Sequence, residues 1–211
     1  MIINQKQVVR NLGVFLDDGL NMDQHVSTIC KNATYQLRLI SRSRHFLTRS
    51  TVAILVHALA ISRIEYCSSL LYGITSQLMR RIDKVIHYGV RLVEGLKRRD
   101  NVTAHRNKLR WLPAAKRPSF RIALLVHKAY KLKMPNNLAQ LIKPRSSSTI
   151  RNLRSSTDGS LSVIRTSSRL GDRAFSAVAP KIWNDLPLDI RELVYHTTFK
   201  CKVLTHYLQH D

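Results

Sequence analysis

Residues 23–42, DQHVSTICKNATYQLRLISR, decide the fold class because their apolar residues recur with helical and not with strand spacing. On a wheel drawn at roughly 100° per residue the apolar positions share one arc. These positions are Val26, Ile29, Cys30, Ala33, Leu37 and Ile40. The opposite arc holds Lys31, Tyr35, Arg38 and Arg42, and Asp23 is suited to the N-cap. We therefore expect an amphipathic helix with a buried side and a cationic side.

Two further helices are expected on the C-terminal side of this stretch. Residues 51–64 are apolar nearly all round, which predicts a second helix buried between neighbours, with the segment ending near Gly73. Ser76 is suited to cap a third helix, whose inward positions are Leu78, Ile82, Val85, Ile86 and Val93. Its outward positions are Arg80, Arg81, Lys84, His87 and Arg91. A basic loop follows at residues 97–99.

The rest of the chain is expected to be helical with less regular connections. A helix after Pro113 places Arg117, Arg121, Lys128 and Lys131 within about 80° of one another. Residues 137–142 predict a short helix, and 144–168 a Ser/Arg-rich loop or weak hairpin around Asp158-Gly159. Two more helices are expected, one beginning at Asp172 and one over 198–208. At the other end of the chain, residues 8–16 predict one strand with no visible partner, ended by a turn at 17–19.

The composition points to a polyanionic partner. The chain has 35 Lys/Arg against 13 Asp/Glu, a formal net charge of +22, and residues 80–133 hold 16 Lys/Arg against 3 Asp/Glu, a balance of +13. Such a field attracts DNA or RNA, with an anionic membrane surface as the competing partner. No apolar run reaches the ~20 residues of a membrane span, and the first ten residues are polar, so we expect an intracellular protein, nuclear or cytoplasmic. Cys30, Cys67 and Cys201 lie far apart and are expected to be reduced thiols.

Five short strings, in this order, resemble the C-terminal third of jockey-like and chicken-repeat-type non-LTR retrotransposon reverse transcriptases. They are residues 11–14 (NLGV) with Asp17 and Asp23, 62–67 (SRIEYC) leading to 71–73 (LYG), 109–113 (LRWLP), 171–175 (GDRAF), and 179–180 (AP) with 183–187 (WNDLP). Together they cover nearly the whole chain, although residues 97–108 and the Ser-rich loop look diverged.

The resemblance implies a division of the chain and a role. Residues 1–18 would be a remnant of the polymerase palm and 19–96 a thumb-like helical domain, followed by a basic helical connection over 97–143 and a C-terminal region over 144–211. The expected fold class is mainly α, a helical bundle with one or two short N-terminal strands and a second small helical region. The implied partner is RNA or an RNA–DNA duplex bound without sequence preference, and the resemblance names the missing palm and fingers polypeptide as a second partner.

Two groups of residues invite a catalytic or metal-binding reading, and we interpret both structurally. The string FLDD at residues 15–18 looks like a polymerase metal site, but only 14 residues precede it and none is acidic, whereas two-metal chemistry needs another, upstream aspartate. His196, Cys201, His206 and His210 match no zinc-finger spacing. We therefore expect no catalytic residue, metal or cofactor, no small-molecule substrate and no membrane. The alternatives are a minimal metal-dependent polymerase or nuclease using Asp17 and Asp18, or a non-functional relic.

The expected nucleic-acid contacts are the cations on helix faces, because phosphate contacts come mainly from Lys and Arg. These candidates are Lys31, Arg38, Arg42, Arg80, Lys84, Arg91, Arg117, Arg121, Lys128 and Lys131. Trp111 and Trp183, each followed closely by Leu and Pro, are expected to anchor loops to the core.

Overall fold

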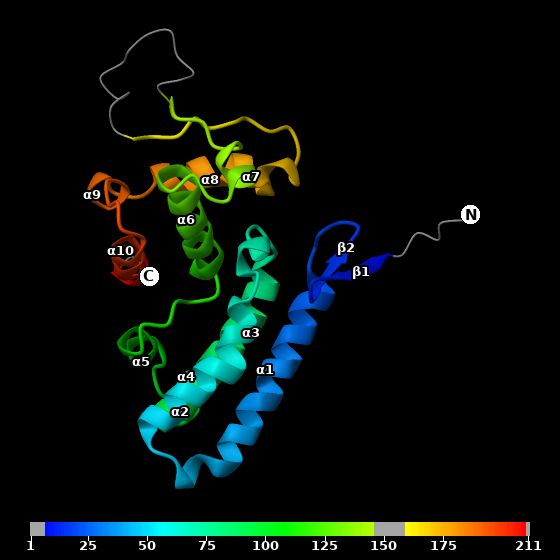
Figure 1. Ribbon diagram of the computed structural model, residues 1–211. Coiled ribbons are helices and arrows are strands. Elements are labelled where there is room, and N and C mark those ends of the chain that lie inside the picture. The colour runs from blue at the N-terminus through cyan, green and yellow to red at the C-terminus, as the bar shows by residue number, and fades with distance from the viewer. Residues whose placement is uncertain (1–6, 146–158, 210–211) are drawn as a thin grey trace. The chain divides into compact units, whose positions relative to one another are not determined.

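The computed structural model describes residues 7–145 and 159–209 (Figure 1). The chain forms two compact units, Met1–Arg117 and Pro118–Asp211, and each is described by itself. Both units are built mainly from helices, and a two-stranded sheet lies near the N-terminus. The expected fold class, mainly α with short N-terminal strands and a second helical region, is confirmed. Among the described residues, no helix is both long and apolar enough to cross a bilayer.

The N-terminal segment is a hairpin and not one strand. β1 (Val8–Asn11) and β2 (Val14–Asp17) pair antiparallel, with Val8 opposite Asp17. The two residues between the strands, Leu12 and Gly13, have φ of 45° and 84°, as a two-residue hairpin turn of the primed kind requires. The expectation of a single strand without a partner was wrong because this turn divides the segment and supplies the partner.

Unit 1 continues as a series of helical segments. In chain order they are α1 (Asp23–Ser43), η1 (Arg44–Phe46), α2 (Arg49–Val56), η2 (His57–Ile61), α3 (Ser62–Glu65), η3 (Ser68–Leu71), α4 (Ser76–Glu94) and α5 (Thr103–Lys108). The second expected helix is thus α2, a π turn and α3 in direct succession. α4 ends at Gly95, whose φ of 69° is the left-handed conformation common after helix ends.

Two helix starts lie one residue away from the expected position. α1 begins at Asp23 itself, and the residue before it is Met22 in the left-handed conformation, with no side-chain cap. α4 begins at Ser76, and its cap is Thr75, whose hydroxyl accepts a hydrogen bond from the backbone N–H of Leu78. The expected caps Asp23 and Ser76 are therefore wrong by one position.

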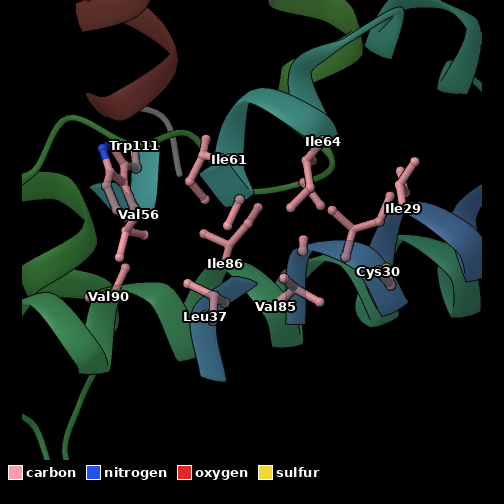
Figure 2. Packing of buried hydrophobic residues seen from close by; sticks show 14 of the residues in the cluster. Ile29, Cys30, Leu37, Val56, Ile61, Ile64, Val85, Ile86, Val90 and Trp111 are labelled. Atoms are coloured by element: carbon pink, nitrogen blue, oxygen red, sulfur yellow. The ribbon is translucent and has the colours of Figure 1, made fainter. Parts of the chain in front are cut away.

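The core of unit 1 lies between α1, α4 and the segment from α2 to α3. The inward residues expected for α1 and α4 are all buried. Figure 2 shows Leu37 of α1, Val56 of α2 and Ile86 of α4 among the side chains that fill this space. The expectation that the second helix is buried all round was wrong, because Ile54 is 68% exposed and Leu59 is 38% exposed. This segment therefore buries one side only.

Unit 2 is built around aromatic side chains. Its helical segments are α6 (Lys116–Lys131, which begins at the end of unit 1), α7 (Asn136–Ala139), η6 (Gly171–Arg173), α8 (Phe175–Asn184), α9 (Leu188–Arg191) and α10 (His196–Gln209). Trp183 and Phe199 are fully buried with ring centroids 5.7 Å apart, and Trp183 donates its indole N–H to the carbonyl of Gly159 at 3.0 Å. Trp111 is also buried, in the core of unit 1. Both tryptophans thus anchor neighbouring segments, as expected.

Two details of unit 2 differ from expectation or lie beyond it. The residue before α8 is Ala174, so the helix expected to begin at Asp172 begins at Phe175. Pro144 and Leu161 form an isolated antiparallel bridge, while most of the expected hairpin between them, including Asp158, lies outside the described residues.

Candidate nucleic-acid interface

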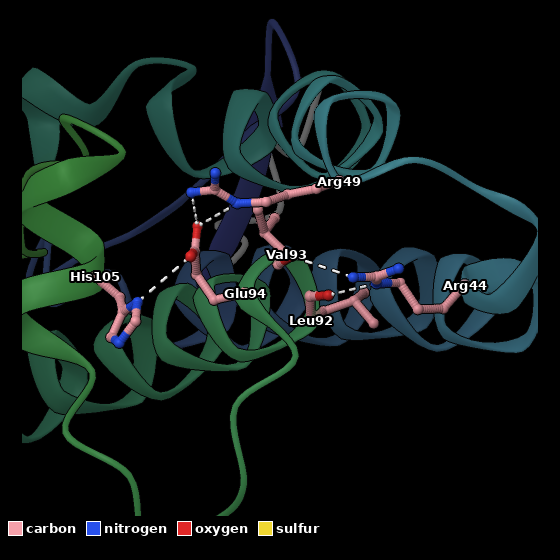
Figure 3. A network of polar contacts seen from close by, with 6 residues as sticks. All are labelled: Arg44, Arg49, Leu92, Val93, Glu94 and His105. Atoms are coloured by element: carbon pink, nitrogen blue, oxygen red, sulfur yellow. Dashed lines mark hydrogen bonds and ion pairs between the residues drawn. The ribbon is translucent and has the colours of Figure 1, made fainter.

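α1 and α4 lie side by side and run in the same direction. Near their N-terminal ends the Arg81 guanidinium donates to the Ser27 hydroxyl at 2.9 Å. Near their C-terminal ends Arg44 Nε donates to the carbonyl of Leu92 at 2.9 Å (Figure 3). Early residues of one helix thus meet early residues of the other, and late residues meet late ones, so the pair is parallel.

The exposed side of α1 carries a cationic stripe. Lys31, Tyr35, Arg38 and Arg42 follow one another at intervals of four, three and four residues, the spacing of one helix face. All four are exposed, and Tyr35 retains 59% of its accessible surface. The expected exposure of these residues is confirmed. No described residue forms a hydrogen bond or ion pair with the three cationic side chains.

α4 repeats the same spacing. Arg80, Lys84, His87 and Arg91 again follow at intervals of four, three and four residues. Arg80 and Lys84 are exposed, whereas His87 and Arg91 are half-buried. Burial lowers the pKa of His87, so its imidazole is neutral at pH 7. The side chains of this stripe that are charged at neutral pH are therefore Arg80, Lys84 and Arg91.

The two stripes face the same side of the helix pair. On each helix the side toward the partner is marked by the contact between Ser27 and Arg81, about 100° from the core direction. Around α1, the cationic stripe lies about 120–180° from the core direction, on the same side as Ser27. Around α4, the cationic stripe lies opposite the core direction of that helix. We call this surface the α1/α4 open face. It consists of Lys31, Arg38, Arg42, Arg80, Lys84 and Arg91.

Most carboxylates of unit 1 form their hydrogen bonds with groups outside the open face, and the unit keeps an excess of positive charge. Residues 7–117 contain 19 Lys/Arg and seven Asp/Glu, a balance of +12. Six of the seven carboxylates accept hydrogen bonds from groups that are not on the open face. They are Asp17, Asp18, Glu65, Asp83, Glu94 and Asp100. The seventh, Asp23, lies in the first turn of α1, where the helix dipole favours an acid.

Glu94 illustrates this arrangement at the C-terminal end of α4 (Figure 3). Its carboxylate accepts hydrogen bonds from Arg49 at 2.6 Å and from His105 at 3.3 Å. Burial raises the pKa of Glu94, but the hydrogen bonds from Arg49 and His105 outweigh this and hold it below the ordinary value. Glu94 therefore ties α4 to α2 and α5 and stays charged at neutral pH.

Arg117 does not belong to an exposed cationic stripe, contrary to the sequence-based expectation. Its side chain is 5% exposed and forms an ion pair with Glu65 at 2.7 Å. Its Nε also donates to the carbonyl of Leu112 at 2.9 Å. The helical wheel could not reveal this contact because Glu65 lies 52 residues away in the sequence. The interaction that fixes Arg117 is internal to unit 1.

The remaining cations of that expected stripe belong to unit 2. Lys128 is exposed, while Arg121 and Lys131 are half-buried. The ammonium of Lys131 lies 5.6 Å from the centroid of the Tyr130 ring, within range of a cation–π contact. These three residues are therefore placed on a separate unit from the α1/α4 open face.

Asp17 and Asp18 hold a turn. The two carboxylate oxygens of Asp17 accept the backbone N–H groups of Asn21 and Met22, each at 2.7 Å, and Asp18 accepts that of Gly19 at 2.8 Å. Burial raises the pKa of Asp17, but these backbone hydrogen bonds lower it more. The pair thus connects β2 to the start of α1, as a strand-ending turn would.

His196, Cys201 and His206 all belong to α10. Within residues 7–145 and 159–209, no group of three or more His, Cys, Asp or Glu side chains is placed to hold a metal ion. His210 lies outside the described residues.

Sequence reasoning missed a groove at the C-terminal end of α4. Tyr88, Arg91, Leu92, Leu96 and Arg98 line an open cavity of about 520 Å³. Arg91 donates to the carbonyl of Arg98 at 3.4 Å, while its buried Nε finds no hydrogen-bond partner among the described residues. The signal was the basic run at residues 97–99, which begins two residues after the helix-ending Gly95 and supplies Arg98 to the groove.

Comparison with known proteins gave no match, whether to a protein family, to a curated protein or to a solved structure.

Proposed function

We propose that this chain binds the phosphate backbone of nucleic acid through the α1/α4 open face, without sequence preference and without catalysing a reaction of its own. The observation that carries the proposal is the pair of parallel cationic stripes at equal spacing, with the carboxylates of the unit engaged elsewhere. Exposed, unneutralised Lys and Arg side chains gain free energy at a polyphosphate through counterion release. Because such contacts reach phosphates and not base edges, they confer little sequence selectivity.

The stated resemblance supports a particular setting for this activity. In non-LTR retrotransposon reverse transcriptases the thumb lies along the template–primer duplex, and the resemblance maps residues 19–96 to that thumb. The helical bundle and its cationic side are compatible with this role. We therefore propose that the chain is a non-catalytic, C-terminal fragment of an RNA-directed DNA polymerase that holds an RNA–DNA duplex or the element's own RNA.

The test measures binding of a fluorescent RNA–DNA hybrid by anisotropy over a range of salt concentrations. If all six cations of the open face contact phosphates, log Kd plotted against log salt should have a slope of about 5. A variant with Lys31→Glu, Arg38→Glu and Lys84→Glu should bind all sequences more weakly and lower that slope by about 3.

A matched control separates the open face from net charge. Lys108→Glu, Lys200→Glu and Lys202→Glu change the charge by the same amount at exposed positions of α5 and α10. If the phosphate contacts are confined to the open face, this control should bind nearly as the parent does, because the long-range effect of net charge is screened at 0.1 M salt. Equal weakening by both variants would contradict an interface on α1 and α4.

Catalysis is tested separately with a primed RNA template, labelled nucleotides and Mg²⁺. We expect no incorporation, since Asp17 and Asp18 hold a backbone turn. Metal-dependent incorporation that disappears in Asp17→Asn would refute the non-catalytic assignment.

A further inference from the structure

A cavity of about 260 Å³ lies between the hairpin, α1 and α3, on the flank of α1 that is turned away from the open face. The residues that α1 contributes to the lining lie on one face of the helix, at intervals of three, one and three. Those residues are His25, Thr28, Ile29 and Asn32. The hairpin contributes Arg10, Gly13 and Phe15, and α3 with the residue after it contributes Arg63 and Tyr66.

His25 is the unusual member of this lining. It is 2% exposed, and neither ring nitrogen has a hydrogen-bond partner among the described residues. Leaving a buried polar group unpaired destabilises the folded state, so such groups are rare in folded proteins. Burial lowers the pKa of His25, which leaves a neutral ring with one donor and one acceptor nitrogen. His25 lines the cavity, and its ring carries one donor and one acceptor nitrogen that the described residues leave unpaired.

The other lining groups narrow the chemistry of that occupant. Asn32 also offers a donor and an acceptor, on the same helix face and seven residues from His25. Phe15 and Tyr66 supply aromatic surface. The Tyr66 hydroxyl donates to the carbonyl of Leu12 at 2.7 Å, which fixes the ring beside Gly13. A flat heterocycle with adjacent donors and acceptors would satisfy these groups.

Two arginines and no carboxylate line the cavity. The Arg10 guanidinium lies 5.6 Å from the centroid of the Phe15 ring, and Arg63 uses Nε to bind the carbonyl of Leu59 at 3.0 Å. The terminal nitrogens of Arg63 therefore remain available at the cavity. Arginine pairs bind phosphate strongly because their fixed donors match its oxygens.

We propose that this cavity binds a free nucleoside monophosphate, with the base edge toward His25 and Asn32 and the phosphate at Arg10 and Arg63. The site is distinct from the α1/α4 open face and does not depend on the function proposed for that face. It also departs from the sequence-based expectation that the chain takes no small molecule.

The test titrates the full chain with AMP, GMP, CMP and UMP by calorimetry, with adenosine and inorganic phosphate as partial probes. At least one monophosphate should bind saturably with one site. The matching nucleoside should bind about tenfold or more weakly, since it lacks the charge-assisted bonds to arginine. If no monophosphate binds, the proposal is overturned.

Two variants locate the site. His25→Phe keeps an aromatic ring of similar shape, removes both unpaired nitrogens and should weaken binding about tenfold or more. Arg63→Gln changes an exposed side chain, so the fold should persist even if His25→Phe misfolds, and it should weaken the monophosphate but not the nucleoside. Affinities unchanged in Arg63→Gln would place the ligand elsewhere and overturn the assignment.

Two comparisons distinguish this site from the nucleic-acid interface and from a site that binds the 5′ end of a nucleic-acid strand. The open-face variant Lys31→Glu, Arg38→Glu, Lys84→Glu should bind the monophosphate as the parent does, and His25→Phe should bind the RNA–DNA hybrid as the parent does. A 5′-phosphorylated dinucleotide should bind no more tightly than the monophosphate. Much tighter binding of the dinucleotide would assign the cavity to a strand terminus and refute a free nucleotide as its ligand.

Discussion

The ion pair between Arg117 and Glu65 supports a quantitative prediction, because its two partners differ in burial. The Arg117 side chain is 5% exposed, whereas that of Glu65 is 28% exposed. Glu65→Leu deprives a buried guanidinium of its carboxylate, and removal of one partner from a buried pair costs about 3–5 kcal/mol. Arg117→Met leaves a carboxylate that water can reach, so we expect a smaller loss of about 1–2 kcal/mol.

Urea unfolding followed by circular dichroism measures both losses, and the double variant closes a thermodynamic cycle. We expect the double variant to be less destabilised than the sum of the two single variants, because each single change removes the ion pair while the other charge remains. Arg117→Met should also bind the RNA–DNA hybrid as the parent does. The reasoning would fail if Arg117→Met lost nucleic-acid affinity while its free energy of unfolding stayed unchanged, since Arg117 would then act as an exposed contact.

Three further predictions concern stability and reactivity. Burial lowers the pKa of His127 and His196 below the ordinary 6.5. Below that pH the unfolded chain therefore binds more protons than the folded chain, and the free energy of unfolding should fall. Urea midpoints at pH 7.5 and 5.5 measure this effect, and a higher midpoint at pH 5.5 would contradict it. Gly95→Ala should cost about 1 kcal/mol from its positive φ, because nothing lies within 4 Å of the added Cβ, and an unchanged melting temperature would argue against this strain. Burial raises the pKa of the Cys30 thiol to about 11. A thiol reagent at pH 7.5 should therefore label the exposed Cys201 and spare Cys30 until the chain is denatured. Mass spectrometry of the peptides shows which cysteine is labelled.

Local periodicity predicted the inner and outer sides of α1 and α4, because a regular helix turns every side chain by a fixed angle. The apolar arc from Val26 to Ile40 is buried, and the cations Lys31, Arg38 and Arg42 are exposed. The same reasoning failed on the second helix, whose residues are apolar nearly all round, because this segment buries one side only and Ile54 and Leu59 reach solvent.

Features that depend on a single backbone conformation or on distant residues were not predicted. The hairpin requires a positive φ at Leu12, which is an unusual residue for that region, so the sequence indicated one strand. The partner of Arg117 lies 52 residues away, and no spacing rule connects the two. The cavity around His25 likewise needs three elements that meet only after folding.

The cationic side of the helix pair follows from how unit 1 uses its few carboxylates. Asp83 accepts the backbone N–H of Ala114 at 2.8 Å, and Glu94 binds Arg49 and His105, so both acids of α4 lie on the flank toward other elements. A helix usually disperses its outer charges with i, i+4 pairs of opposite sign. Here the acids hold loops and neighbouring helices, and consequently the outer cations repel one another at a cost to stability. A polyanion bound along the face would remove that repulsion, so nucleic acid should raise the melting temperature of the parent chain more than that of the open-face variant.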